Sequence, residues 1–201
     1  RPHTYDVVIV GGTPAGITAA VAAAREGKNS VILERSDHVG GLPANGLGAT
    51  DIATRGATAG LFARFVVLNK AHYTEKYGAD SQQVRDCSDG YHFEPSVAAE
   101  TFARMLAEAG PGRITVLTGR QFDAEARYVE KRGDRIVSIR ILDRATGREE
   151  HYRGAVFIDA TYEGDLGAAA GVPFRTGREG AAEYGEPCAG KIYRWWKHGP
   201  D

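Results

Sequence analysis

Residues 5–35, YDVVIVGGTPAGITAAVAAAREGKNSVILER, constrain the fold of this chain more than any other stretch. The short apolar run at residues 6–10 is rich in β-branched side chains, which is typical of a strand buried on both faces. It leads into the turn GGTPAG, residues 11–16, and then into an alanine-rich helical segment that Gly27 ends. A second buried strand is predicted at residues 30–33. Together these elements predict one βαβ unit with a glycine-rich first turn.

The predicted turn has the features of a dinucleotide-binding site. Gly11 permits a tight turn out of the strand, and Gly16, which has no Cβ, lets the helix pack close to the sheet. The free N–H groups and the positive end of the helix dipole suit a pyrophosphate. Glu34 follows the second strand, where a carboxylate can accept hydrogen bonds from a ribose diol. An ordinary glycine turn would leave the position of Glu34 unexplained.

One residue departs from the G-x-G-x-x-G fingerprint. Thr13 stands where the fingerprint has its second glycine. A β-branched side chain there is expected to hinder the close approach of a pyrophosphate. Its hydroxyl can offer a hydrogen bond in return, so nucleotide binding is still expected.

Composition and charge exclude several classes of protein. The chain has 201 residues, 42% of them hydrophobic, which suits one large domain or one domain with a lobe. Its net charge is -1 and it has no basic block, which argues against nucleic acid and anionic membranes as partners. No apolar run approaches the length of a membrane span. We therefore expect no nucleic acid and no membrane partner.

The two cysteines, Cys87 and Cys188, form neither a C-x-x-C pair nor a zinc pattern, so no metal is expected. The spacing favours two free thiols, although a disulfide in an oxidising compartment stays open. The sequence starts just before its first strand, which fits a trimmed chain as well as a mature chain without its signal peptide. The localisation therefore stays open between cytoplasmic and secreted.

The middle of the chain is predicted to be mainly helical. A glycine-rich loop at residues 35–51 is typical of backbone that approaches a ligand closely, and His38 within it is interpreted as a solvated side chain. Apolar residues at helical spacing predict a helix over residues 58–77. Ser96 is expected to cap another helix that ends near residue 109.

Alternating patterns with glycine breaks predict strands in the second half. The predicted strands are residues 113–118, 122–131, 135–143 and 149–153, with the second and third forming a hairpin around Gly133 and Asp134. A buried run at residues 155–158 is expected to return to the core sheet, before a short helix at 166–171. The predicted fold class is therefore α/β, a Rossmann-like domain with a central parallel sheet and a small antiparallel β insertion.

We expect this domain to span residues 1–177, with the insertion at about 113–153. Residues 178–201 are expected to start a substrate domain or an interface segment. Trp195 and Trp196 lie in that segment, and adjacent tryptophans normally need a surface to cover them.

Five segments carry a resemblance to a known family. They are VVIVGGTPAGITAAVAAAREG (7–27), ILER (32–35), GGLPANGLG (40–48), FEPSVAAETFARMLAEAG (93–110) and FIDATYEGDLGAAAGVPFRTGRE (157–179). In this order they resemble the glutathione-reductase-type FAD-dependent oxidoreductases. More narrowly, they resemble the broad bacterial and fungal family of FAD-dependent oxidoreductases that is often mislabelled as xanthan lyases. Threonine at the position of Thr13 is common in that family.

The resemblance implies FAD as the cofactor and assigns its contacts. Residues 11–16 would hold the pyrophosphate and Glu34 the adenosine ribose, with Arg35 over the adenine. Residues 40–45 would approach the ribityl and flavin end, and the strand end at 159–161 would make a second contact. The implied cofactor-binding residues are Gly11, Gly12, Thr13, Pro14, Ala15, Gly16, Glu34, Arg35, Gly40, Gly41, Leu42, Asn45, Phe122, Ala160, Thr161 and Asp165.

The implied activity is the oxidation of a small organic substrate by hydride transfer to the flavin. No catalytic residue is assigned, since His92 and Tyr162, the nearest polar candidates, are more often structural. Two alternatives stay open: an NAD(P)-dependent reductase, because Glu34 suits NAD equally well, and a non-catalytic FAD-binding subunit. Members of the family are longer, so a second polypeptide segment is expected to complete the flavin site.

Overall fold

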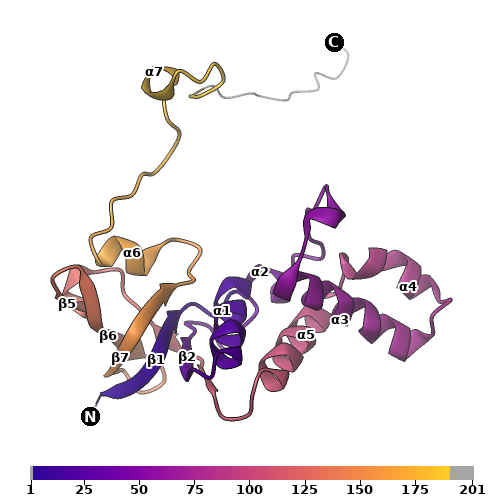
Figure 1. The fold of residues 1–201 in the computed structure, drawn as a ribbon, viewed down its shortest axis with the longest axis horizontal. Helices are drawn as coiled ribbons and strands as arrows, with labels where there is room; N and C mark the ends of the chain where they lie inside the picture. Colours follow the sequence, from indigo (N-terminus) through magenta and orange to yellow (C-terminus); the bar gives the residue numbers. More distant parts are fainter. Residues whose placement is uncertain (1, 191–201) are drawn as a thin grey trace.

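The computed structural model describes residues 2–190, which form an α/β body with an extended segment after it (Figure 1). Its seven-stranded sheet has the order β3-β2-β1-β7-β6-β4, and β5 pairs with β6. The strands are β1 (His3–Val10), β2 (Ser30–Leu33), β3 (Ile114–Leu117), β4 (Arg120–Gln121), β5 (Val129–Arg132), β6 (Arg135–Asp143) and β7 (Arg148–Asp159).

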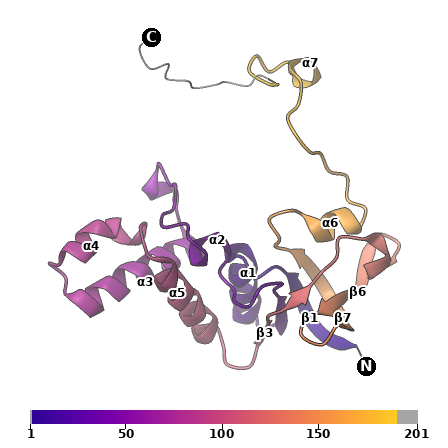
Figure 2. The same cartoon turned by 180° about the vertical axis from the view of Figure 1, so that it is seen from behind.

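The helices that precede β3 gather on the side of the body opposite to the antiparallel strands β5 and β6, whereas the short helix after β7 lies near those strands (Figures 1 and 2). The α-helices are α1 (Pro14–Arg25), α2 (Gly41–Ala44), α3 (Gly60–Tyr77), α4 (Gln82–Asp86), α5 (Pro95–Glu108), α6 (Asp165–Ala169) and α7 (Ala181–Tyr184). Short 3₁₀ turns are η1 (Arg55–Ala57), η2 (Ser88–Gly90) and η3 (Ala126–Tyr128). Within residues 2–190, none of the helices has the length and apolarity that crossing a membrane requires.

The central part of the sheet is parallel, as predicted. β1 pairs in parallel with β2 on one side and with β7 on the other, so that Val8 lies between Val31 and Phe157. β3 continues the parallel order beyond β2. The carboxyl ends of β1, β2 and β7 therefore meet at one edge of the sheet, where open α/β sheets bind ligands.

The antiparallel insertion starts later than predicted. β3 pairs with β2 in parallel and belongs to the core, so the start of the insertion at about residue 113 was wrong; its first antiparallel strand is β4. The sequence of a strand as short as ITVL does not indicate whether it pairs in parallel or antiparallel. That depends on the strand beside which it lies. The hairpin around Gly133 is confirmed by the antiparallel pairing of β5 with β6.

Two of the predicted strands also have different bounds. The strand expected at residues 122–131 is interrupted by η3, with the amide of Glu125 bonded to the carbonyl of Asp123 in the preceding turn. The strands expected at 149–153 and 155–158 are one strand, β7. Its first half pairs antiparallel with β6 and its second half pairs parallel with β1, so one strand joins both parts of the sheet.

The predicted cap of α5 was wrong by two residues. The helix starts at Pro95, and Glu94 is its N-cap residue, so Ser96 lies inside the first turn. Proline is favoured at the first helical position because its missing N–H would have no helical partner there. The carboxylate of Glu94 instead accepts a hydrogen bond from the hydroxyl of Tyr73 on α3, and burial raises the pKa of Tyr73 to about 12.

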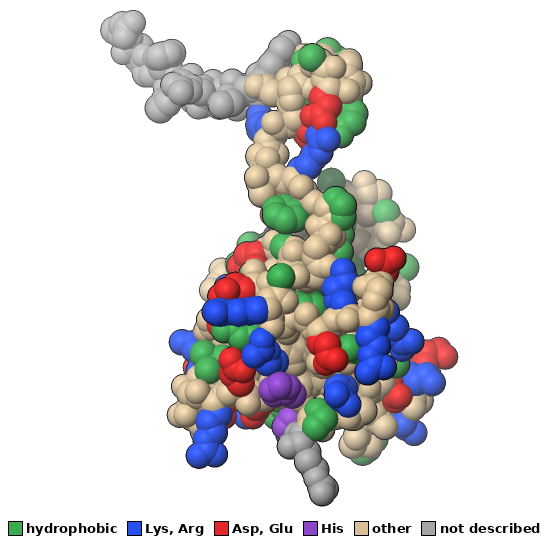
Figure 3. Space-filling view, turned by 90° about the vertical axis from the view of Figure 1, so that its left-hand side faces the viewer, with side chains coloured by type: hydrophobic (Ala, Val, Ile, Leu, Met, Phe, Trp, Pro, Cys, Tyr) green, Lys and Arg blue, Asp and Glu red, His purple; other side chains and the backbone are tan. Residues whose placement is uncertain are grey.

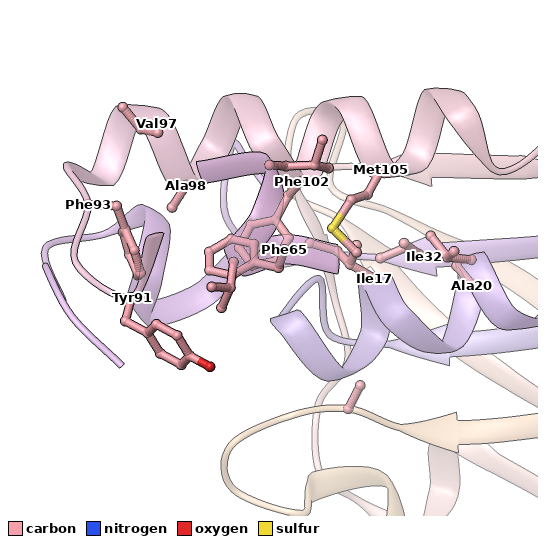
Figure 4. Packing of buried hydrophobic residues seen from close by; sticks show 14 of the residues in the cluster. Ile17, Ala20, Ile32, Phe65, Tyr91, Phe93, Val97, Ala98, Phe102 and Met105 are labelled. Atoms are coloured by element: carbon pink, nitrogen blue, oxygen red, sulfur yellow. The ribbon is translucent and has the colours of Figure 1, made fainter. Parts of the chain in front are cut away.

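The core has a cluster on each face of the sheet. On the helical side, the ring of Phe65 stacks on Phe102 at a centroid distance of 4.6 Å, and Met105 points toward Ile17 and Ile32 (Figure 4). On the other side, the fully buried Val8, Val31, Ile139, Ile141 and Tyr152 pack with Phe122. Each buried side chain of this size contributes about 1.5–3 kcal/mol. These layers hold the strand ends in place.

The surface over the strands mixes both signs of charge, with Lys and Arg side chains interspersed among Asp and Glu (Figure 3). This distribution agrees with the small net charge of -1. Cys87 is buried and Cys188 is exposed, and both are free thiols, as the spacing favoured. Trp195 and Trp196, expected at an interface, lie outside the described residues.

Candidate functional site

A cleft with a volume of about 280 Å³ lies at the carboxyl edge of the parallel strands. Its walls come from the ends of β1 and β2, the turn before α1, the loop between β2 and α2, and the loop after β7. The lining residues are Val10, Gly11, Thr13, Leu33, Glu34, Arg35, Ser36, His38, Gly41, Leu42, Asn45, Arg120, Phe122, Thr161, Tyr162, Glu163 and Asp165.

Most of the predicted site residues line this one cleft. Those brought together are Gly11, Thr13, Glu34, Arg35, Gly41, Leu42, Asn45, Phe122, Thr161 and Asp165. Gly12, Pro14, Ala15, Gly16, Gly40 and Ala160 lie beside them in the chain but outside the lining. Sequence reasoning did not assign Val10, Leu33, Ser36, His38, Arg120, Tyr162 or Glu163. Most of these are sequence neighbours of assigned residues, and extending each assigned strand end by one or two positions finds them.

Both predicted roles of the turn glycines are visible in the backbone. Gly11 has φ +102°, and a Cβ on it would lie 2.6 Å from the carbonyl oxygen of Ala160. A Cβ on Gly16 would lie 2.0 Å from the carbonyl oxygen of Gly11. Such distances exclude a side chain at either position. The glycines therefore let β1, β7 and the start of α1 converge on the cleft.

The hydroxyl of Thr13, which was expected to offer a hydrogen bond to a pyrophosphate, is bonded within the protein. It donates to the carbonyl oxygen of Ala160 at 2.7 Å and accepts from the N–H of Gly16 at 3.4 Å. The side chain is buried. Thr13 is thus the N-cap of α1 and joins the turn to the end of β7.

The start of α1 offers unused donors toward an anion. Among the described residues, the backbone N–H groups of Thr13 and Ala15 donate no hydrogen bond within the protein. The first turn of a helix has such free donors, and the helix dipole adds partial positive charge there. The turn therefore fits a diphosphate group.

Glu34 connects the glycine turn to the loop after β2. One carboxylate oxygen accepts from the N–H of Gly12 at 2.7 Å, and the other accepts from the N–H of Ser36 at 2.7 Å. A carboxylate has about four lone-pair sites, so each oxygen can accept one more hydrogen bond. Since Glu34 also lines the cleft, this capacity is available to a ligand hydroxyl.

The loop after β7 forms the opposite wall and is held by its own side chains. Asp159 accepts from the hydroxyl of Thr161 at 2.7 Å and from the N–H of Gly167 at 2.8 Å. The hydroxyl of Thr161 in turn accepts from the N–H groups of Gly164 and Asp165. Burial raises the pKa of Asp165, and the neighbouring carboxylates add to this effect.

Two contacts cross from this loop to the segment after β2. The hydroxyl of Tyr162 accepts from the N–H of Leu42 at 2.7 Å, and Glu163 pairs with Arg35 at 3.3 Å. The ion pair is exposed and adds little to stability. Gly41 has φ +56°, and a Cβ on it would lie 2.2 Å from the Tyr162 hydroxyl, so a side chain there would strain the backbone and displace Tyr162.

Arg120 closes the cleft on the side of the antiparallel strands. Its guanidinium donates to Glu150 at 3.1 and 3.2 Å and lies 3.5 Å from Asp143. The pKa of Glu150 is lowered, mainly by this hydrogen bond. Burial raises the pKa of Tyr152, whose hydroxyl donates to Glu150 at 2.5 Å. The network fixes β4 against β6 and β7.

The two polar candidates from the sequence are separated by the fold. Tyr162 lines the cleft, whereas His92 lies outside the lining and bonds through its backbone N–H to Cys87 at 3.0 Å. Within the part of the chain that the structure describes, no cluster of His, Cys, Asp and Glu side chains could hold a metal ion.

Comparison with known proteins gives one family and a common fold. The family model described as FAD dependent oxidoreductase matches residues 6–197. A soluble pyridine nucleotide transhydrogenase of Chromohalobacter salexigens is 49% identical over 39 residues, which is 19% of this chain and 8% of that protein.

Solved structures resemble the fold at low identity. An L-proline dehydrogenase from P. horikoshii matches with a TM-score of 0.55 at 16% identity, over 89% of this chain and 59% of that one. A glycerol-3-phosphate dehydrogenase from Bacillus halodurans, complexed with FAD, matches with a TM-score of 0.55 at 13% identity, over 83% of this chain and 36% of that one. The chain thus spans less than two thirds of each of these proteins.

Proposed function

This chain belongs to the FAD-dependent oxidoreductase family, and we propose that it is the FAD-binding portion of an enzyme that oxidises a small organic substrate by hydride transfer to flavin. FAD is the cofactor of this family, and the Rossmann-like sheet agrees with it. Hydride transfer from the substrate and the residues that hold FAD are our proposals beyond the family and its cofactor.

The observation that carries the proposal is the convergence of three groups on one cleft. The free N–H groups at the start of α1 would hold the diphosphate, and Glu34 would accept hydrogen bonds from the adenosine ribose. Arg35 and Phe122 would line the adenine. Toward the flavin end, the proposed contacts are Gly41, Leu42, Asn45, Thr161 and Asp165.

When bound, FAD supplies the electron-accepting ring, and the chain supplies binding and orientation. Val10 and Leu33 form an apolar floor that excludes water from beneath the ligand. The Tyr162–Leu42 hydrogen bond ties the loop after β7 to α2 and so fixes one wall of the cleft within the protein. A formed wall lowers the ordering cost of binding.

We further propose that a second polypeptide segment completes the flavin site. The chain spans 36% and 59% of two FAD-fold structures that it resembles, and the proposed flavin end carries exposed side chains. Leu42 is 55% exposed and Tyr162 is 55% exposed, although both line the cleft. Exposed apolar groups beside a cleft are typical of a surface that another segment covers.

The test is the identity of the bound cofactor. Purified protein should show flavin absorbance, and acid or heat precipitation should release a yellow supernatant whose solute has the mass of FAD. A yellow pellet under a colourless supernatant would show a covalent flavin and contradict the binding mode proposed here. Anaerobic mixing with candidate organic substrates should then bleach the flavin band, because hydride transfer reduces the ring.

An NAD(P)-dependent reductase is the second candidate. The short match to a pyridine nucleotide transhydrogenase favours it, and a carboxylate at Glu34 suits the ribose of NAD as well as that of FAD. A protein without visible absorbance that quenches NADH fluorescence on binding would support this alternative. Flavin bands without reduction by any substrate would instead support a non-catalytic FAD-binding subunit.

A further inference from the structure

His38 lies in the loop between β2 and α2 and lines the cleft, although its place in a glycine-rich loop suggested a solvated side chain. The backbone around it is fixed on both sides. The hydroxyl of Ser36 donates to the carbonyl oxygen of His38 at 2.8 Å, and the N–H of Gly40 donates to the carbonyl of Gly12 at 2.7 Å. The loop is thus attached to the same turn that starts α1.

The imidazole of His38 is held by the carboxylate of Asp37. Its Nδ1 lies 2.6 Å from a carboxylate oxygen of Asp37, whose side chain is 93% exposed. The hydrogen bond to Asp37 raises the pKa of His38, with smaller contributions from Asn45 and from the charge of Glu34, while burial opposes them. The same bond lowers the pKa of Asp37. The geometry fixes the orientation of the ring beside the cleft.

The other charged side chains that line the cleft supply little free positive charge, so a cation at His38 would favour the binding of an anionic ligand. Three carboxylates line the cleft: Glu34 at the end of β2, with Glu163 and Asp165 on the opposite loop. Of the two lining arginines, Arg35 pairs with Glu163, and Arg120 pairs with Glu150 and Asp143. Both arginines are therefore already engaged by carboxylates. Arg120 has two acidic partners, and the partner of Arg35 itself lines the cleft, whereas His38 has a single acidic partner, Asp37, which lies outside the lining and is 93% exposed.

We propose that His38, oriented by Asp37, contributes a positive charge that stabilises the diphosphate group of the bound cofactor. This inference rests on the function proposed above and adds a residue to the site. The helix start supplies neutral N–H donors, and His38 supplies a full charge when its ring is protonated. Cofactor binding therefore depends on pH through this residue.

The direction in which FAD affinity changes with pH follows from the raised pKa of His38 in the folded protein. Below that pKa the ring is charged and attracts the diphosphate, so FAD binds more tightly. As the pH rises through it, the charge is lost and FAD binds more weakly. The pKa of Asp165 is also raised, so Asp165 is the other group of the cleft whose protonation favours an anion at lower pH.

The experiment is a titration of the purified protein with FAD, and separately with ADP, at a series of pH values from about 6 to about 9. The parent should bind either ligand about twofold to fivefold more weakly at the upper end, the size expected for one partly exposed charge. In His38→Gln the affinity for either ligand should not change with pH and should equal the weaker affinity that the parent shows at high pH. Asp37→Asn should keep the dependence but move its midpoint to lower pH, because the pKa of His38 loses its main support.

His92→Gln, at an exposed histidine outside the cleft lining, is the matched control and should keep the pH dependence of the parent across this range. Circular dichroism should show that each variant is folded. A His38→Gln profile that superimposes on that of the parent, or a parent without pH dependence, overturns the inference. Absence of FAD binding with ADP binding that depends on His38 would instead reject the proposed flavin function and leave the diphosphate contact standing.

Discussion

The carboxylate of Glu34 accepts a hydrogen bond from the backbone N–H of Gly12 at 2.7 Å, so the residue proposed to hold the ribose also holds the glycine turn. Its second oxygen holds the N–H of Ser36 at the same distance. One side chain therefore fixes two of the loops that form the cleft. Changes at Glu34 should affect both cofactor binding and the stability of the protein without cofactor.

Glu34→Ala should weaken FAD binding by about tenfold to a hundredfold, since a hydrogen bond to a charged group contributes roughly 1.5–3 kcal/mol. The cofactor-free variant should also unfold at lower urea, because two backbone donors lose their acceptor. Glu34→Gln should lose less in both measurements. Glu26→Ala, at an exposed carboxylate beyond the end of α1, is the control. FAD binding like that of the parent would show that the ribose assignment is wrong.

Gly16→Ala should destabilise the fold by about 1–3 kcal/mol or more, because the added Cβ would lie 2.0 Å from a backbone oxygen that cannot easily move. Urea unfolding without cofactor measures this directly. Gly56→Ala is the matched control, since a Cβ there meets no atom within 4 Å. Equal unfolding midpoints for the two variants would contradict the close packing of α1 on β1.

Thr13→Val should lower the free energy of unfolding by about 1–3 kcal/mol, because it keeps the shape of the side chain but removes the hydroxyl bonded to Ala160. Thr13→Ser keeps this hydroxyl and should retain most of the stability. The comparison of the two variants by urea unfolding separates the hydrogen bond from the methyl group. A valine variant as stable as the serine variant would argue against the bond as the reason for Thr13.

The Arg120–Glu150 pair should stabilise the protein at neutral pH and lose its effect in acid. The pKa of Glu150 is lowered in the folded state, so its contribution is present above the unfolded pKa, about 4.3, and is lost as the pH falls through the folded value. Glu150→Gln should therefore be less stable than the parent at neutral pH, and the difference should shrink in acid. Glu149→Gln, in a more exposed pair with Arg140, should show a smaller difference. Parallel stability curves for Glu150→Gln and the parent would refute this.

Native mass spectrometry of the protein from its source should show a longer polypeptide or a non-covalent assembly, because the proposed flavin site needs another segment to cover the ring. The measurement is the mass together with substrate turnover of the same sample. A lone species of 21.6 kDa with full turnover would exclude the second segment.

The βαβ unit could be predicted because its signals are local. The strand run before Gly11, the glycine turn, the alanine-rich helix and the acid at Glu34 follow one another in the sequence, and each has its own composition. The family and its cofactor were implied by a resemblance that five segments carry, among them this unit and the segment at residues 157–179. The hairpin around Gly133 was likewise a local signal, since a two-strand turn needs little more than its own residues.

The neighbours of each strand and the full lining of the cleft were decided only by the tertiary structure. β7 pairs in parallel with β1 from the other end of the sequence, and β3 takes its direction from β2; a short apolar run encodes neither choice. The same pairings bring Arg120, Tyr162 and His38 to one cleft. Sequence specifies such residues individually, but their proximity arises from backbone hydrogen bonds and packing between distant segments, which leave no local pattern.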